Sequence, residues 1–230
     1  MDAKIHVSRL GGTATVPPSK SAAHRAVLCA ALAEGTSHIT NIEYSKDIRA
    51  TLGAAASWAQ NHRGGPLRDH QGARDGGRLC DGDTPGFLQR ERLHTAVHDP
   101  LFSLTAQKVR FTGAGRLFDR PQAIYQMLFE RQGLQFEQTP EGITIFGRLR
   151  PGGFTLPGDV SSQFISGLLF AAPLMESESS IEVLAPYESR SYVDMTVDAL
   201  QQFGVKVTSR ARKNGSVNVP RGRAAAVYGQ

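Results

Sequence analysis

Strand-like and helix-like segments alternate along most of this 230-residue chain, and this alternation strongly constrains its fold. Apolar residues at a period of two predict strands, and apolar residues at a helical period predict helices. From residue 108 onward the expected elements are a strand at 108–112, a helix at 121–131, a hairpin at 134–138 and 143–146, a strand at 154–156, a helix at 161–174, a strand at 180–184, a helix at 192–203 and a strand at 205–208. A hairpin inserted into such an alternation favours an α/β (or α+β) domain built from repeated β-α-β-α-β-β units.

The N-terminal part of the chain follows the same rhythm. Strands are expected at 4–7, 14–16 and 38–42, and helices after Ser19 and at 47–56. Ser19 is a favourable N-cap, and the two prolines before it disfavour helix upstream. Gly35 stands where a C-terminal cap belongs, so the first helix has suitable residues at both ends.

The start of this first helix carries a group of polar residues in the run PPSKSAAHR. Ser21 and Arg25 are four residues apart and share a helix face, while Lys20 lies in the first turn. A first turn also offers free backbone N–H groups and the positive end of the helix dipole, both of which attract phosphate. The spacing therefore predicts a pocket for a small phosphorylated anion. The alternative is an amphipathic helix whose charges are solvated.

The overall charge agrees with anionic partners without specifying them. The formal net charge is +5, the isoelectric point is near 9.5, and the hydrophobic and charged fractions of 40% and 20% are ordinary for a globular protein. Only 7% of residues are aromatic, the basic residues are spread out, and no helix-turn-helix, zinc or RNP motif occurs. We therefore expect no nucleic-acid binding, although a basic nucleic-acid-binding domain stays the alternative from another functional class.

Cysteine usage and hydropathy argue against several other classes. Cys29 and Cys80 have no metal-site or disulfide spacing, and Cys29 lies on the apolar face of the first helix. No apolar run reaches the roughly 18 residues of a membrane span, and charged or polar residues interrupt the N-terminus where a signal peptide would need an apolar core. We expect a cytoplasmic protein that does not bind membranes.

Four separated blocks of sequence resemble one enzyme family. They are PPSKSAAHRAVLCAALAEGTSHITNIEYSKDIRATL from residue 17, GRLFDRPQ at 115–122, GDVSSQFISGLL at 158–169 and ESRSYVDMT at 188–196. In this order they resemble 5-enolpyruvylshikimate-3-phosphate (EPSP) synthase, also called 3-phosphoshikimate 1-carboxyvinyltransferase. The sister family that transfers enolpyruvate to UDP-N-acetylglucosamine is a weaker match, because it has asparagine where this chain has Ser21.

The resemblance implies a two-lobed enolpyruvyl transferase fold with the active site between the lobes. Each lobe of that fold contains β-α-β-α-β-β units, with helices inside and sheets outside. This chain would then supply one lobe at 17–208, with 1–16 forming first strands that belong partly to the other lobe. Residues 209–230 lose the family pattern and are expected to be an unmatched tail.

The resemblance also implies a reaction and its ligands. The family transfers the enolpyruvyl group of phosphoenolpyruvate to the 5-hydroxyl of shikimate 3-phosphate and releases phosphate, without a metal or organic cofactor. By motif, Lys20, Ser21 and Arg25 would bind shikimate 3-phosphate, with Lys20 also reaching phosphoenolpyruvate, and Arg120 would bind phosphoenolpyruvate. The other expected shikimate 3-phosphate contacts are Ser161, Ser162, Gln163, Ser189 and Tyr192.

Each of these assignments has a structural alternative. Arg120 would otherwise be an exposed arginine at a helix start, Ser161 an ordinary N-cap, and Tyr192 a core aromatic residue at helical spacing. His24 is interpreted as a surface or packing residue and Asp47 as a structural carboxylate, so neither is included in the site.

Residues 57–99 fit neither the family nor the surrounding rhythm, because they are glycine-rich, charged and aperiodic. A flexible insertion is one explanation. The other is translation in a displaced frame: with free synonymous codons, residues 89–99 read one nucleotide forward permit NESGSTLRFMI and then proline. That string resembles the substrate-binding segment that the family carries at this point. Resequencing the locus would decide between the two.

The resemblance places the proton-handling aspartate, the catalytic lysine and further phosphoenolpyruvate-binding arginines in the second lobe. Because proximity and charge stabilisation dominate such a reaction, we expect this chain alone to be inactive. A non-catalytic fragment that binds shikimate 3-phosphate, or a pseudogene product, is the alternative. The intact family is expected to be monomeric.

Overall fold

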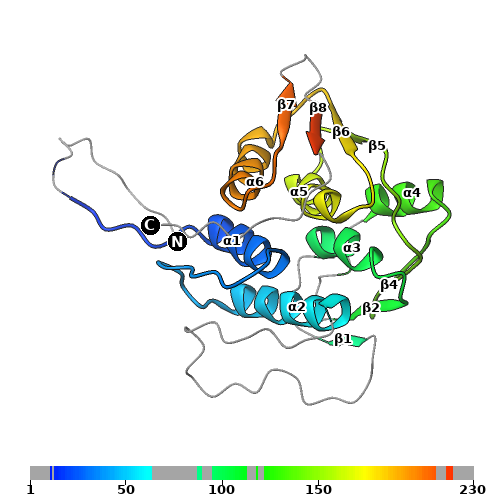
Figure 1. The fold of residues 1–230 in the computed structure, drawn as a ribbon, viewed down its shortest axis with the longest axis horizontal. Coiled ribbons are helices and arrows are strands. Elements are labelled where there is room, and N and C mark those ends of the chain that lie inside the picture. The colour runs from blue at the N-terminus through cyan, green and yellow to red at the C-terminus, as the bar shows by residue number, and fades with distance from the viewer. Residues whose placement is uncertain are drawn as a thin grey trace, which may run out of the picture.

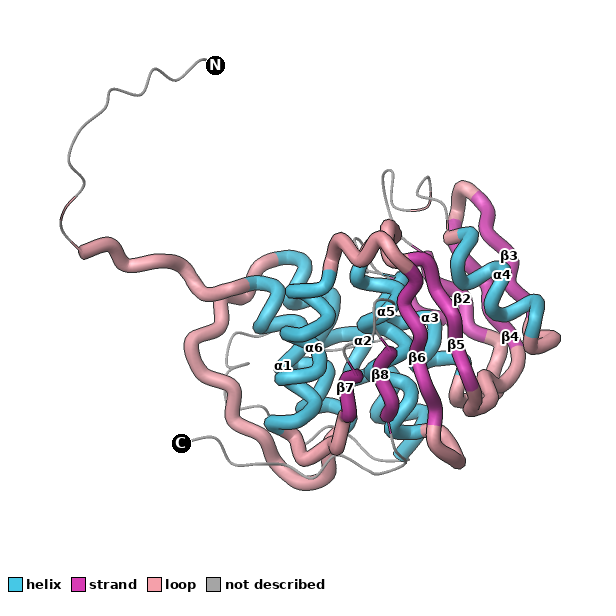
Figure 2. Tube along the Cα trace, turned by 90° about the horizontal axis from the view of Figure 1, so that it is seen from above, coloured by secondary structure: helices cyan, strands magenta, loops and turns pink. Residues whose placement is uncertain are grey.

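The computed structural model describes residues 11, 13–63, 87–89, 95–112, 118, 122–210 and 216–219 of the chain. In this part of the protein, helices occupy the middle and two four-stranded sheets lie toward the outside (Figure 1). The view from above shows the same arrangement, with the strands of each sheet side by side (Figure 2). The fold is therefore a mixed α/β architecture, as the alternation predicts.

The first sheet belongs to one complete β-α-β-α-β-β unit. Its elements are β1 (Phe87–Gln89), α3 (Thr95–Ser103), β2 (Val109–Thr112), α4 (Ala123–Arg131), β3 (Gln135–Thr139) and β4 (Gly142–Phe146). The strand order is β1-β2-β4-β3, where β1 and β2 are parallel and β4 is antiparallel to both of its neighbours. Strands β3 and β4 form the expected hairpin.

The second sheet repeats this topology. Its elements are β5 (Gly153–Pro157), α5 (Ser162–Ala171), the 3-10 helix η1 (Ala172–Leu174), β6 (Ser179–Leu184), α6 (Arg190–Gln202), β7 (Thr208–Arg210) and β8 (Ser216–Val219). The order β5-β6-β8-β7 has the same pattern, with the first pair parallel and the other two pairs antiparallel. The predicted β-α-β-α-β-β repeat is thus present twice among the described residues.

Two further helices, α1 (Lys20–Leu32) and α2 (Lys46–Arg63), precede these units and pack against each other. The Ser19 hydroxyl accepts a hydrogen bond from the Ala22 N–H at 3.3 Å, as expected for the N-cap. The strands expected at 14–16 and 38–42 are wrong: neither segment joins a sheet. Val16 is 78% exposed, so the apolar residues of the segment 14–16 do not pack against the described core. The strand expected at 4–7 lies outside the described residues.

The remaining differences from expectation are one shifted strand and elements that the sequence did not predict. The strand expected at 205–208 is found three residues later, and strand β8 lies inside the segment 209–230, which was expected to be an unmatched tail. Within the segment 57–99, the structure describes the end of α2, strand β1 and the first part of α3.

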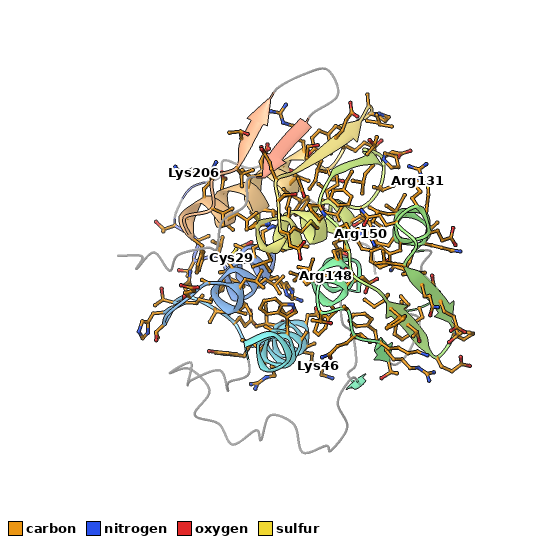
Figure 3. All side chains as sticks on the ribbon, turned by 45° about the vertical axis from the view of Figure 1, so that its right-hand side comes forward. Cys29, Lys46, Arg131, Arg148, Arg150 and Lys206 are labelled. Atoms are coloured by element: carbon orange, nitrogen blue, oxygen red, sulfur yellow. The ribbon has the colours of Figure 1, made fainter. Side chains whose placement is uncertain are left out.

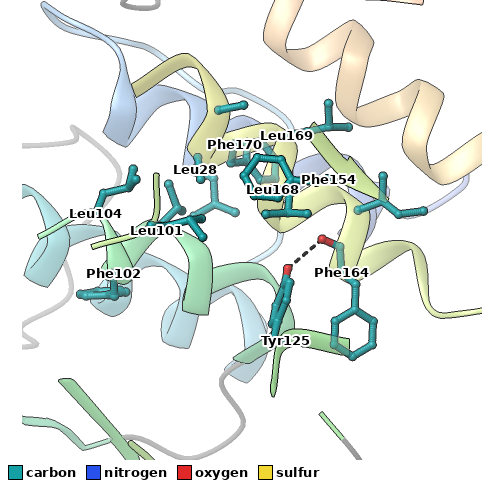
Figure 4. Packing of buried hydrophobic residues seen from close by; sticks show 14 of the residues in the cluster. Leu28, Leu101, Phe102, Leu104, Tyr125, Phe154, Phe164, Leu168, Leu169 and Phe170 are labelled. Carbon is teal, nitrogen blue, oxygen red and sulfur yellow. Dashed lines mark hydrogen bonds between the residues drawn. The ribbon is translucent and has the colours of Figure 1, made fainter. Parts of the chain in front are cut away.

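The hydrophobic core lies between α3, α5 and the inner faces of the two sheets (Figure 4). Phe102 of α3 packs edge-to-face on Phe111 of β2, with ring centroids 5.6 Å apart. Tyr125 of α4 packs against the Phe164 ring of α5 at 5.0 Å and donates a 2.7 Å hydrogen bond to the Phe164 carbonyl. These contacts tie the two β-α-β-α-β-β units into one body.

Cys29 lies in this core rather than on the surface (Figure 3). Burial raises the pKa of its thiol to about 12, so it behaves as an apolar core residue, as its place on the helix predicts. The labelled cations Lys46 and Arg131 belong to α2 and α4, and Lys206 follows α6, so these charges are dispersed over the surface (Figure 3).

Candidate functional site

A pocket of about 270 Å³ opens where α1, α2 and α5 meet. Its lining is polar and cationic on the α1 side, and apolar toward the core. The lining residues are Lys20, Ser21, His24, Arg25, Leu28, Asp47, Thr51, Gln163, Ser166 and Phe170. Four of the predicted site residues, from segments more than 130 positions apart in the sequence, therefore line one pocket: Lys20, Ser21, Arg25 and Gln163.

Lys20 stands at the first turn of α1, immediately after the N-cap. Its Nζ lies 3.0 Å from an Oδ2 oxygen of Asp47 on α2, and this ion pair joins the first turns of the two helices. Both side chains retain contact with solvent, so the pair contributes little to stability. Its importance is local, since it places a lysine and a carboxylate together at the pocket.

Arg25 is held much more firmly than Lys20. Its Nε donates to Thr196 Oγ1 at 2.8 Å, its Nη1 to the Ser21 carbonyl at 2.8 Å and its Nη2 to the Tyr192 carbonyl at 2.9 Å. A guanidinium carries five N–H donors, so these bonds leave one N–H on each terminal nitrogen within the described part of the chain. Desolvation by burial lowers the pKa of Arg25. A partly desolvated cation of this kind binds an oxyanion more strongly than one in open water.

The N-terminus of α5 approaches the pocket from the opposite side. Ser161 is the N-cap, and its Oγ accepts a hydrogen bond from the Gln163 N–H at 3.4 Å. The capping alternative for Ser161 is therefore confirmed, and this bond uses the Gln163 backbone N–H, not the Ser162 hydroxyl or the Gln163 side-chain amide. Ser162 follows the cap as the first helical residue, while Gln163 reaches the pocket.

Ser189 and Tyr192 lie at the start of α6. Ser189 Oγ donates to the Val160 carbonyl at 3.3 Å, which ties the beginning of α6 to the loop before α5. Tyr192 is 49% exposed, so the alternative of a core aromatic residue is wrong. The backbone carbonyl of Tyr192 accepts the hydrogen bond from Arg25 Nη2.

A close backbone approach brings these two helix starts together. A Cβ atom at Gly158 would collide with the carbonyl oxygens of Leu184 and Pro186, and would lie 3.0 Å from the Tyr187 Cα. The Glu188 N–H also donates to the Gly158 carbonyl at 3.2 Å. Only glycine fits this crossing, which positions Ser161 and Ser189 on neighbouring loops.

The structure adds pocket residues that the sequence interpretation left out. His24 lines the pocket, and its Nδ1 is 2.7 Å from Thr51 Oγ1 on α2. Asp47 also lines it. Residues 20, 21, 24, 25 and 28 follow one helix face, so helical spacing alone would have placed His24 beside Lys20 and Arg25. Asp47, on a different helix, has no such signal in the sequence.

One predicted residue, Arg120, lies outside the described residues. Among the residues that are described, no cluster of three or more histidine, cysteine or carboxylate side chains has the arrangement of a metal site. None of the helices in the same part of the chain is both long and apolar enough to cross a membrane.

The fold and the pocket together define one α/β lobe that carries a cationic, partly buried pocket at helix N-termini. A profile of the EPSP synthase (3-phosphoshikimate 1-carboxyvinyltransferase) family matches residues 5–226. The chain therefore belongs to the EPSP synthase family.

Individual relatives agree with this family. The chain is 37% identical over 213 residues to a 3-phosphoshikimate 1-carboxyvinyltransferase of Clostridium kluyveri, a match covering 88% of the chain and 48% of the relative. It is 34% identical over 219 residues to the enzyme of that name from Clostridium novyi, covering 91% of the chain and 50% of the relative. The chain thus spans about half the length of the curated relatives it matches.

A solved structure of EPSP synthase from Acinetobacter baumannii has the same fold. It aligns with a TM-score of 0.66 at 24% identity, covering 95% of this chain and 49% of the solved chain. The described part of the chain therefore corresponds to one lobe of the two-lobed fold.

Proposed function

We propose that this chain is the N-terminal lobe of a 3-phosphoshikimate 1-carboxyvinyltransferase and that its pocket binds shikimate 3-phosphate. In this proposal residues 17–208, together with strands β7 and β8 that complete the second sheet, make up the binding lobe, and residues 1–16 belong partly to the other lobe. The observation that carries the proposal is the convergence of Lys20, Ser21, Arg25 and Gln163 on one pocket.

The chemistry of this pocket suits a phosphorylated polyol. The two N–H groups left on the ends of Arg25 and the ammonium of Lys20 match phosphate oxygens, which favour bidentate and charge-assisted hydrogen bonds. Ser21, Gln163 and the Asp47 carboxylate offer neutral and anionic partners for ring hydroxyls. A carboxylate at the edge of the pocket would repel inorganic phosphate, whereas it can accept hydrogen bonds from the hydroxyls of a phosphorylated polyol.

The remaining predicted residues are assigned to phosphoenolpyruvate or to the rim of the pocket. We assign Arg120 to phosphoenolpyruvate, and Ser161, Ser162, Ser189 and Tyr192 to the rim of the shikimate 3-phosphate site. Ser189 and the Tyr192 backbone contact the loop before α5 and Arg25, which supports a shared rim. The transfer reaction itself also needs acid–base groups, which the family supplies from its second lobe. We propose that the complete enzyme acts in the cytoplasm and uses no metal or organic cofactor.

Calorimetric titration of the 230-residue chain with shikimate 3-phosphate tests the binding proposal. We expect saturable binding that is stronger than binding of shikimate or inorganic phosphate. Replacing Lys20 by Met removes one charge-assisted contact and should weaken shikimate 3-phosphate binding by about tenfold or more, because such contacts contribute about 1.5–3 kcal/mol. Lys20 is largely exposed, so the variant should remain folded.

Lys206→Met is the matched control, because Lys206 is also an exposed lysine but lies after α6, away from the pocket lining. It should bind shikimate 3-phosphate like the unmodified chain. Equal weakening by both substitutions, or tighter binding of an oligonucleotide than of shikimate 3-phosphate, would overturn the proposal in favour of a nonspecific basic surface.

A further inference from the structure

A buried hydroxyl on α6 lies behind the pocket and contacts the cation that lines it. Thr196 is 0% exposed and Ser166 of α5 is 2% exposed, so neither is solvated. Thr196 Oγ1 accepts from Arg25 Nε at 2.8 Å, lies 2.8 Å from Ser166 Oγ and donates to the Tyr192 carbonyl at 3.0 Å. Three helices, α1, α5 and α6, therefore meet at one hydroxyl group.

We propose that Thr196 is a positioning residue that sets the orientation of the Arg25 guanidinium for anion binding. The inference rests on the proposed function for the identity of the anion, a phosphate monoester. Thr196 itself does not line the pocket, so it would act through Arg25 rather than on the ligand.

The number of donors and acceptors around the Thr196 hydroxyl determines its orientation. A threonine hydroxyl has one proton to donate and two lone pairs that accept. The proton goes to the Tyr192 carbonyl, since that acceptor offers no proton in return. Thr196 then accepts from Arg25 Nε and from Ser166 Oγ, and all three of its positions are occupied. A hydroxyl satisfied in this way cannot rotate without breaking a buried hydrogen bond.

This hydroxyl holds one particular edge of the guanidinium. Nε and Nη2 form one edge of the planar group, and they donate to Thr196 Oγ1 and the Tyr192 carbonyl on α6. Nη1 donates to the Ser21 carbonyl on α1. One N–H then remains on each terminal nitrogen, and a guanidinium with donors on both terminal nitrogens can bind a phosphate or carboxylate bidentately. Loss of the Thr196 contact would free the group to rotate away from this arrangement.

The test compares Thr196→Val, which keeps the shape and removes the hydroxyl, with Thr196→Ser, which keeps the hydroxyl. Two readouts are recorded for each variant. The first is the NMR signal of the Arg25 Nε–H, assigned by its absence in Arg25→Lys, and its rate of exchange with water. The second is the calorimetric affinity for shikimate 3-phosphate and for shikimate. Urea unfolding establishes that each variant is folded.

We expect fast Nε–H exchange and an affinity for shikimate 3-phosphate reduced by about tenfold in Thr196→Val, the amount that a hydrogen bond to a charged group contributes. Affinity for shikimate, which carries no phosphate, should change less. Thr196→Ser should restore both the protected signal and the affinity. If Thr196 had only a structural role, Thr196→Val would change the urea unfolding curve, but Thr196→Ser would not restore the Nε–H protection and the shikimate 3-phosphate affinity together.

Unchanged Nε–H protection in folded Thr196→Val would overturn the inference, as would unchanged affinity for shikimate 3-phosphate. If the unmodified chain does not bind shikimate 3-phosphate, the proposed function fails, and the NMR readout alone decides the positioning role. If Thr196→Val does not fold, Thr196→Ala takes its place, because it also removes the hydroxyl that accepts from Arg25 Nε. Unaltered Arg25 Nε–H exchange in that folded variant would contradict the inference.

Discussion

At the scale of single residues, Asp99 is the group least suited to its surroundings. It lies in α3, is 0% exposed, and neither carboxylate oxygen has a hydrogen-bond partner within the described residues. Desolvation by burial raises the pKa of Asp99 well above its ordinary value. Burial of Tyr125, and after it the nearby charge of Asp99, raises the pKa of Tyr125 well above its ordinary value. A buried carboxyl without a partner costs about 1–3 kcal/mol or more.

The raised pKa of Asp99 predicts the sign of a pH effect on stability. Below the ordinary pKa of about 4, both the folded and the unfolded chain carry the proton, and the group imposes no titration cost. As the pH rises above that value, the unfolded chain loses its proton first, so the free energy of unfolding falls until the folded-state pKa is passed. Asp99→Asn should remove this slope when urea unfolding is compared at about pH 5 and about pH 8.

Asp99→Ile should increase the free energy of unfolding at neutral pH by about 1–3 kcal/mol, because it replaces an unpartnered carboxyl by an apolar side chain. Isoleucine is also the residue that the displaced reading frame permits at this position, so the variant probes the proposed origin of the segment 57–99. Asp198→Asn, an exposed substitution on α6, is the control and should leave both the stability and the slope unchanged. Equal stability of the Ile variant and the unmodified chain would argue that the carboxyl belongs to this core.

At the scale of elements, most of the two β-α-β-α-β-β units was predictable, from β2 to β4 and from β5 to α6, because these helices and strands differ clearly in hydrophobic period. Elements β1, α3 and β8 were not predicted, because their segments have no recognisable period. The strand expected at 38–42 failed for the opposite reason: an alternating run is only a strand when a neighbouring strand accepts its hydrogen bonds. The later start of β7 likewise depends on its pairing with β8, a partner beyond the recognisable pattern. Pairing is a property of the sheet and not of the segment.

The crossing at Gly158 is also an element-scale feature. Gly158→Ala would place a methyl group against the carbonyls of Leu184 and Pro186, so the loops before α5 and α6 must separate. We expect a loss of about 1–3 kcal/mol in the free energy of unfolding, as for other overpacked sites, and weaker shikimate 3-phosphate binding. Thermal and urea unfolding with calorimetry measure the two effects.

Gly153→Ala is the matched control, because a Cβ there would meet only the Ser180 hydroxyl at 3.6 Å, an ordinary contact distance. It should change the free energy of unfolding much less than Gly158→Ala. Similar losses in both variants would indicate a general intolerance of alanine in this sheet region instead of a specific backbone crossing.

At the scale of the whole molecule, the chain spans about half the length of its curated relatives. The pocket lies on the lobe to which this length corresponds, and in the proposed function the groups that transfer protons at the enolpyruvyl group come from the other lobe. We therefore expect no phosphate release above background when the 230-residue chain is incubated with phosphoenolpyruvate and shikimate 3-phosphate. A coupled phosphate assay measures this, and turnover that the Lys20→Met variant abolishes would contradict the expectation.

The sequence by itself determined most of the repeat, the family and the cationic first turn of α1, because these depend on local period, local spacing and contiguous motifs. Only the tertiary structure decided how Arg25 is used. Its partners Thr196 and Tyr192 lie more than 160 residues away, and no spacing rule relates them. The burial of Asp99 and the carboxylate beside Lys20 also appear only after folding. The physical reason is common to these cases: desolvation and hydrogen bonding depend on which elements meet, and the packing of helices α1, α2, α3, α5 and α6 decides that.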